Sequence, residues 1–73
     1  MRADYAREAA QRAASSGGAL TPEDAILHAL LAGAPGQLAE AARILAATPL
    51  LDRDYLEYWV DGLGLQERWR ALG

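Results

Sequence analysis

Apolar and polar residues recur along this chain with the three-to-four-residue period of helices. In one segment Leu38, Ala41, Ala42 and Leu45 follow each other at i, i+3, i+4 and i+7, which places them on one face of a helix. No segment alternates every second residue with β-branched side chains, as a strand would. We therefore predict an all-α fold: a small bundle of four to five short helices joined by tight turns.

The first predicted helix covers residues 4–14, "DYAREAAQRAA", with Asp4 as a candidate N-cap. It ends at "SSGG", where Gly17 or Gly18 can adopt the left-handed conformation. Apart from Tyr5, the apolar stripe of this helix consists of alanines, so it has the weakest hydrophobic anchor. Two outcomes are open for it: fraying, or packing against a second chain.

A second helix is predicted up to Gly33 by signals at both of its ends. Thr21 suits the N-cap and Pro22 the first helical position. Glu23 and Asp24 then place negative charge at the positive end of the helix dipole. This helix is apolar over a wide arc, so we expect it at the centre of the core. Its two apolar stripes are Ile26 with Leu30 and Leu27 with Leu31.

A third helix is predicted over about residues 37–47, after the break "GAPG". Thr48–Pro49 stops it, because the residue before a proline avoids helical geometry.

The fourth helix begins after Asp52, its expected N-cap, and ends at Gly64. Leu51 and Leu56 have the spacing of a hydrophobic staple. A short last helix covers residues 66–72. We expect a buried stripe of Leu56, Trp59, Val60 and Leu63, with Leu65 against Val60 and with Trp69 and Leu72 on the side of Leu65.

The 73 residues are enough for one domain, residues 1–73, with a thin folding margin. Much of the 52% hydrophobic content is alanine, so a homodimer or docking onto a larger protein would add buried surface. The net charge of −3 argues against nucleic-acid binding. The chain has no cysteine and therefore no thiolate metal site or thiol nucleophile.

The chain contains no apolar run of the length that spans a bilayer, and its first residues lack the hydrophobic segment of a signal peptide. We therefore expect a cytoplasmic protein without membrane contact.

His28 is the single histidine, four residues after Asp24, which suggests that a carboxylate orients its ring. A catalytic triad with Ser15 or Ser16 is one interpretation. A histidine at the solvent edge of an apolar helix is the more ordinary one, because the serines lie in a turn where small hydroxylated residues are common.

Two short motifs imitate ligand sites. "DRD" at residues 52–54 has the spacing of paired metal-binding carboxylates, but Asp52 is used as an N-cap and Asp54 as a first-turn charge. "SSGG" imitates a phosphate cradle without the lysine that such loops use. We expect no cofactor, no metal and no small-molecule substrate.

The aromatic residues of the fourth helix suggest a recognition surface. We expect Trp59 in the core, which leaves Tyr58 and Tyr5 as the exposed pair that a protein partner would contact. The acidic edge of Asp54, Glu57 and Asp61 is typical of a solvated face.

From Leu20 onward, the blocks "LTPEDAILHALLAGAPGQLAEA" and "LDRDYLEYWVDGLGL" resemble the C-terminal helical portion of bacterial nucleotidyltransferase-like proteins, including toxins of the abortive-infection and toxin–antitoxin type. The resemblance divides the domain into residues 1–18, an alanine-rich helix with its "SSGG" turn, and residues 19–73, the family-like helices.

The resemblance implies a scaffold that has lost its chemistry. In the family a Lys, an Arg and two Asp converge on the nucleotide from positions that correspond here to Ala29, Ala34, Gln37 and Glu40, and only Glu40 keeps a charge. The family's catalytic β-sheet, with its Gly-Ser turn and paired aspartates, has no counterpart in this sequence.

The sequence therefore favours a non-catalytic helical module that acts through protein association, as an antitoxin-like or regulatory partner or as a homodimer. One alternative is an engineered or computationally generated helical domain without biological activity, because polar positions are replaced by alanine while caps and core are kept. A further alternative is residual nucleotide binding at the turn around Gly33 to Gly36.

Overall fold

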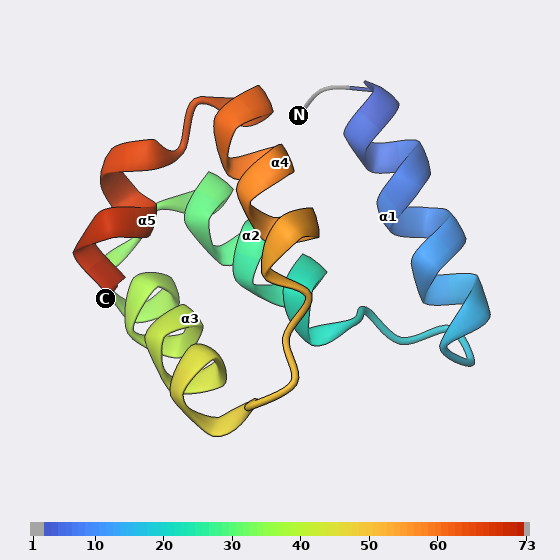
Figure 1. Ribbon diagram of the computed structural model, residues 1–73, viewed down its shortest axis with the longest axis horizontal. Helices are drawn as coiled ribbons and strands as arrows, with labels where there is room; N and C mark the ends of the chain where they lie inside the picture. Colours follow the sequence, from blue (N-terminus) through green and yellow to red (C-terminus); the bar gives the residue numbers. More distant parts are fainter. Residues whose placement is uncertain (1–2, 73) are drawn as a thin grey trace.

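The computed structural model describes residues 3–72, which form five α-helices and contain no β-strand. In chain order the helices are α1 (Ala3–Ser15), α2 (Pro22–Ala32), α3 (Pro35–Ala47), α4 (Arg53–Leu63) and α5 (Gln66–Leu72), as Figure 1 shows. The predicted all-α class and the small helical bundle are therefore confirmed.

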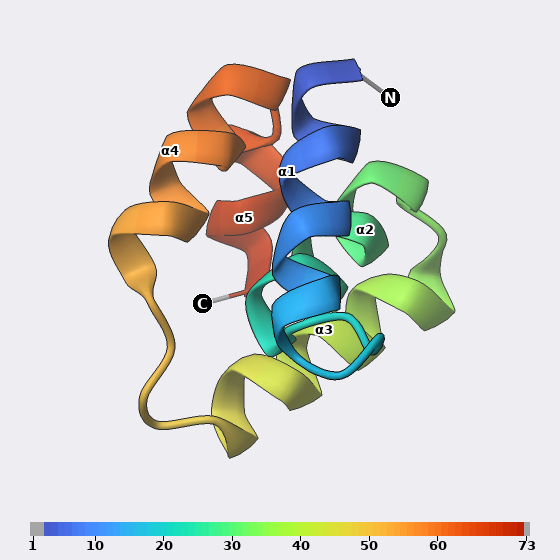
Figure 2. The ribbon, with the colours of Figure 1, turned by 90° about the vertical axis from the view of Figure 1, so that its right-hand side faces the viewer.

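Helix α2 is the central element of the bundle. It packs against α3 and α4, and α5 closes the arrangement by packing against the same two helices. Helix α1 lies at the outside, where it covers one side of α2 and α4 (Figures 1 and 2). The radius of gyration of 11.4 Å agrees with the value of about 11 Å expected for a folded chain of this length.

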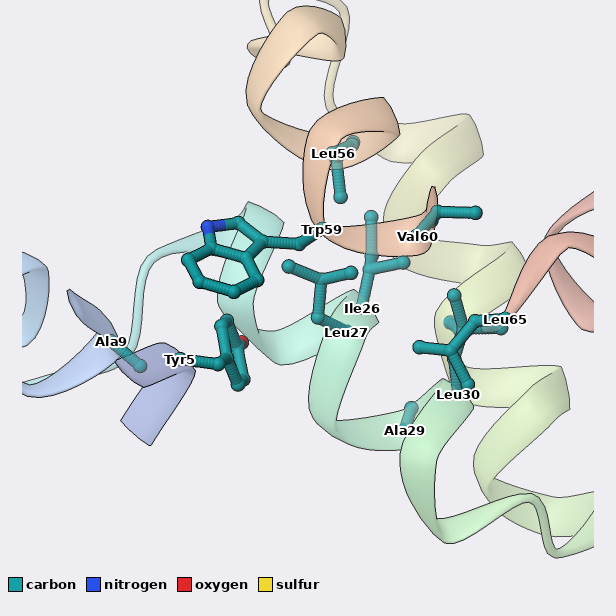
Figure 3. Packing of buried hydrophobic residues seen from close by; sticks show 11 residues of the cluster. Tyr5, Ala9, Ile26, Leu27, Ala29, Leu30, Leu56, Trp59, Val60 and Leu65 are labelled. Atoms are coloured by element: carbon teal, nitrogen blue, oxygen red, sulfur yellow. The ribbon is translucent and has the colours of Figure 1, made fainter. Parts of the chain in front are cut away.

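The hydrophobic core joins α2 to α4 and receives one large side chain from α1 (Figure 3). Ile26, Leu27 and Leu30 of α2 are completely buried, as is Leu56 of α4. Three of the four residues in the predicted apolar stripes of α2 are therefore confirmed as the centre of the core, and the fourth, Leu31, is partly buried against it. The remaining members of the core are Tyr5, Ala9, Ala29, Ala41, Trp59, Val60 and Leu65.

The predicted helix signals are confirmed at both ends of α2 and α4. The Thr21 hydroxyl accepts the N–H of Asp24, and the Asp52 carboxylate accepts the N–H of Tyr55. Gly33 and Gly64, with φ of +73° and +71°, end the two helices in the left-handed conformation.

The turn after α4 also has the predicted geometry. The N–H of Leu65 donates to the carbonyl of Val60 at 2.8 Å, and Leu65 is buried. This is the pairing of a Schellman motif, in which a hydrophobic contact accompanies the turn. Trp69 and Leu72 of α5 pack against the same core, as expected.

Two predicted helix starts are wrong. Helix α3 begins at Pro35, two residues earlier than expected, because proline fits the first helical position even where Ala34 supplies no side-chain cap. Helix α1 begins at Ala3, so Asp4 lies within its first turn and accepts the N–H of Tyr5. Asp4 is therefore not the residue that precedes this helix.

Helix α1 packs on its own chain. Tyr5 is completely buried and Ala9 is 4% exposed, which gives this alanine-rich helix an anchor that its composition did not suggest. None of the helices within residues 3–72 combines the length and the apolar character needed to cross a bilayer.

Candidate functional site

The two buried carboxylates of the described chain lie side by side in the first turn of α2. Asp24 has no exposed surface, and Glu23 is 8% exposed. Around them gather side chains from three helices and one cap. We call this group the Asp24 cluster; it consists of Tyr5, Arg12, Thr21, Glu23, Asp24 and Tyr55.

Asp24 is the hub of the cluster. The hydroxyls of Tyr5 and Tyr55 both donate to its Oδ1, at 2.9 Å and 2.6 Å. The Thr21 hydroxyl donates to Oδ2 at 3.1 Å, and Arg12 Nε lies 3.4 Å from the same oxygen. Both oxygens of this buried carboxylate are thus stabilised, which a buried charge requires.

Glu23 extends the cluster to the start of α4. Its Oε1 accepts Arg12 Nη2 at 3.2 Å, and its Oε2 accepts the N–H of Asp52 at 3.0 Å. The Arg12 guanidinium also lies over the Tyr55 ring, 3.8 Å from its centroid. Arg12 of α1 is therefore held by carboxylates of α2 and by an aromatic face of α4.

The tyrosine hydroxyls of the cluster act as hydrogen-bond donors. Burial raises the pKa of both Tyr5 and Tyr55, and the hydrogen bonds to Asp24 raise it further. Both phenols therefore stay protonated at neutral pH. Asp24 has no exposed surface, and its hydrogen bonds connect α1 to α2 and α4.

Glu23 and Asp24 lie in the first turn of the helix as predicted, but their tertiary contacts were not predicted. A signal for it was present: Glu23 precedes Ile26, Leu27 and Leu30 by three, four and seven residues. Glu23 therefore continues the core-facing stripe into the first turn, where a charge must be paired.

The structure does not bring a Ser/His/Asp arrangement together. Asp24 is occupied by the two tyrosines and Thr21, and the Ser15 hydroxyl donates to the carbonyl of Gln11. His28 packs its ring edge-on against Tyr5, with the centroids 5.8 Å apart. Its Nε2 is buried and has no hydrogen-bond partner among the described residues.

The two motifs that imitate ligand sites have structural uses. Asp52 caps α4, and Asp54 is exposed. Within residues 3–72, no three His, Cys, Asp or Glu side chains are grouped so that they could hold a metal ion. In "SSGG" the N–H of Gly18 donates to the carbonyl of Ala13 at 2.8 Å, so this turn is used to end α1.

The four positions that the resemblance assigns to nucleotide contacts have different environments. Ala29 is 9% exposed and belongs to the core. Ala34, Gln37 and Glu40 are exposed at the start of α3, and the Glu40 carboxylate accepts a hydrogen bond from Arg43. The charge that remains at these positions is thus paired within its own helix.

Arg68 also lies at this turn, a position that no local sequence signal predicts. Its Nη1 donates to the carbonyls of Leu30 and Leu31 at 2.6 Å and 3.3 Å. A Cβ on Gly33 would lie 2.7 Å from Arg68 Cζ. A cation from α5 therefore completes the end of α2, where the helix has no basic residue in its last turn.

Of the two tyrosines expected to be exposed, Tyr58 is exposed and the prediction for Tyr5 is wrong. Tyr5 has no exposed surface, because its ring fills the space between α1, Trp59 and α2, and its hydroxyl is used by Asp24. Tyr58 is 69% exposed, and its ring packs edge-on against Trp59 with the centroids 5.0 Å apart. Asp54, Glu57 and Asp61 are exposed around it, as expected for a solvated edge.

A comparison with protein families, curated proteins and solved structures finds no match for this chain.

Proposed function

We propose that this chain is a non-catalytic helical module that acts by protein association, as an antitoxin-like or regulatory partner in the cytoplasm, and that the outer face of α4 is its docking surface. We define the α4 face by its exposed residues Asp54, Glu57, Tyr58 and Asp61.

The observation that carries the proposal is the placement of Tyr58. Tyr58 is 69% exposed, yet its ring packs against the buried indole of Trp59. An aromatic side chain that is already ordered loses little entropy on binding, and tyrosine is enriched among the residues that dominate interface energies.

The charge around Tyr58 indicates the chemistry of the partner. Three exposed carboxylates on the same helix favour a partner surface that carries arginine or lysine. The polar groups elsewhere support association over catalysis, because the Asp24 cluster and Arg68 are used for bonds within the fold.

The test uses two synthetic amphipathic helical peptides, one with arginine along its polar face and one with glutamate at the same positions. Binding is measured by fluorescence anisotropy and mapped by NMR chemical shifts. We expect the arginine peptide to bind, more weakly at high salt, and Tyr58→Ala to weaken binding at least about tenfold.

The matched control is Leu50→Ala, which truncates a 92% exposed apolar side chain outside the α4 face. It should leave peptide affinity unchanged. Equal binding of the glutamate peptide, or equal effects of Tyr58→Ala and Leu50→Ala, would contradict the proposed surface. A thermal midpoint that rises with the concentration of Mg²⁺ and ATP or GTP would contradict the proposed absence of nucleotide binding.

A further inference from the structure

Helix α1 is held to the rest of the chain by side chains along one of its faces. Tyr5, Ala9 and Arg12 are spaced at i, i+4 and i+7, so they form a single stripe. The Tyr5 ring centroid lies 4.9 Å from that of Trp59, and its hydroxyl reaches Asp24. Arg12 reaches both buried carboxylates.

The surface that receives α1 is built entirely by other helices. Glu23 and Asp24 come from α2, and Tyr55 and Trp59 come from α4. These two helices also pack against each other, and α3 and α5 pack on them from the side away from α1. Binding of α1 to this surface therefore depends on the side chains of α1. It does not depend on which copy of the chain carries that helix.

One exposed linker joins α1 to this surface. Residues 16–20 are exposed, and Thr21 is half-buried as the cap of α2. Gly17 and Gly18 have φ of +76° and +93°, and a Cβ on either would meet no atom within 4 Å. The linker can therefore change its path without disturbing the core.

We propose that α1 exchanges between two copies of this chain, so that α1 of each copy occupies the α2–α4 surface of the other. Every contact of Tyr5, Ala9 and Arg12 with α2 and α4 is then made across the two copies, and only the linker changes conformation. Such exchange is a route to dimers that requires no new interface. It is independent of the α4 face, because Tyr58 lies outside the surface that α1 covers.

The occupant is a second copy because the α1 sequence already satisfies this surface. The surface presents two buried carboxylates, the rings of Tyr55 and Trp59, and a space filled by Tyr5. Arg12 supplies the positive charge, and the Tyr5 hydroxyl supplies a donor. The same set of groups is delivered by any copy of the full chain.

The direct test mixes isotope-labelled and unlabelled full-length chain, unfolds them together and refolds them at millimolar concentration. We expect a dimer by light scattering and nuclear Overhauser contacts between the Tyr5 ring of one copy and the Trp59 ring of the other. A refolded sample in which this contact occurs only within one copy would overturn the proposal.

Linker variants give a second test that leaves the α1 stripe intact. The double substitution Gly17→Val and Gly18→Val disfavours the closed turn, because branched side chains resist a positive φ. We expect it to raise the association constant of the dimer at least about tenfold. Ala19→Val is the matched control in the same linker, at a residue without positive φ, and should leave the constant unchanged.

A charge exchange identifies the contact that is made between copies. Arg12→Glu adds a third carboxylate beside Glu23 and Asp24, and Glu23→Arg places two guanidinium groups beside Asp24, both in a closed monomer and in a dimer of identical chains. Mixed together, they can form a heterodimer in which one half keeps the original charges and the other half holds two carboxylates and one guanidinium in exchanged positions, so that both halves have the net charge of the original site. We expect a heterodimer by native mass spectrometry, with a thermal midpoint above that of either variant alone.

A mixture that stays monomeric, together with linker variants that do not dimerise, would overturn the exchange. The outcome is separable from that of the proposed function. Saturation with the arginine peptide should not affect dimerisation, and the linker variants should not affect peptide binding at the α4 face.

Discussion

Asp24 is a fully buried carboxylate that is stabilised by hydroxyl groups as much as by a cation. The hydroxyls of Tyr5 and Tyr55 converge on one oxygen, while Thr21 and Arg12 approach the other. Hydrogen bonds to a charged group contribute more than bonds between neutral groups. Because these donors come from α1, α4 and the cap of α2, the stability of one residue depends on three parts of the fold.

Replacing Tyr5 by phenylalanine should therefore destabilise the protein while keeping its ring in the core. Loss of a hydrogen bond to a buried carboxylate costs about 1.5–3 kcal/mol, measured as the free energy of unfolding in urea. Tyr58→Phe is the control, because that side chain is 69% exposed, and should change the free energy by less than about 0.5 kcal/mol. Equal effects of the two substitutions would show that the Asp24 bond contributes nothing.

The same tyrosines predict a loss of stability in alkali. Burial raises the pKa of Tyr5 and Tyr55 above the value of about 10 that an unfolded chain has. Above pH 10 the unfolded state releases protons that the folded state keeps, so unfolding becomes more favourable as the pH rises. With two such groups the free energy of unfolding should fall by at most about 2.7 kcal/mol per pH unit.

Urea unfolding followed at a series of pH values from 8 to 11.5 checks this prediction. The stabilising contribution is complete below the unfolded pKa and is lost above it. The double variant Tyr5→Phe with Tyr55→Phe should be less stable at neutral pH but should have a flatter alkaline profile. An unchanged slope in this variant would mean that other groups cause the alkaline loss.

At the scale of elements, the end of α2 shows how one helix completes another. Gly33 ends the helix in the left-handed conformation, and Arg68 of α5 donates to the carbonyls of Leu30 and Leu31. The guanidinium occupies the space where a Cβ of residue 33 would lie. The glycine is thus favoured by its φ, and a Cβ at this position would displace the Arg68 guanidinium.

Gly33→Ala should cost more than Gly64→Ala, although both glycines have nearly the same positive φ. Each substitution forces alanine into a left-handed conformation, at a cost of about 1–2 kcal/mol. Only the Gly33 variant also displaces Arg68 from its carbonyl partners, which adds about 1 kcal/mol. In an Arg68→Ala background the two variants should become equally destabilising in urea, and a difference that persists there would contradict this account.

At the scale of the whole molecule, the signals that lie close together in the sequence predicted the helices well. Caps, prolines and glycines act within one turn, so Thr21, Asp52 and Gly64 were assigned from their immediate neighbours. The apolar stripes of α2 and α4 likewise predicted the core.

The Asp24 cluster and the Arg68 contact could not be predicted in this way. Tyr55 meets Asp24 across 31 residues, and Arg68 meets Leu30 across 38. Such contacts depend on how helices are arranged, which a local pattern does not contain. The burial of Tyr5 was missed for the same reason, since the alanine-rich helix around it gave no sign of a carboxylate partner.

The arrangement of the helices also predicts that α1 detaches from the fold before the rest of the molecule unfolds. Helix α1 is attached by one stripe and one exposed linker, whereas α2 to α5 share the main core. Elements with few buried contacts open at a lower free energy than the whole fold. Native-state hydrogen exchange should therefore give α1 amides an opening free energy at least about 1 kcal/mol below that of α2 and α4 amides.

This measurement separates an autonomous α1 from a fully cooperative fold. Tyr5→Phe should lower the opening free energy of α1, because it weakens the contact with Asp24 that closes this helix. Leu50→Ala, which removes an exposed side chain far from α1 in the sequence, should leave it unchanged. If α1, α2 and α4 amides exchange with one common free energy, α1 does not detach before global unfolding, and its exchange between copies would require the whole chain to unfold first.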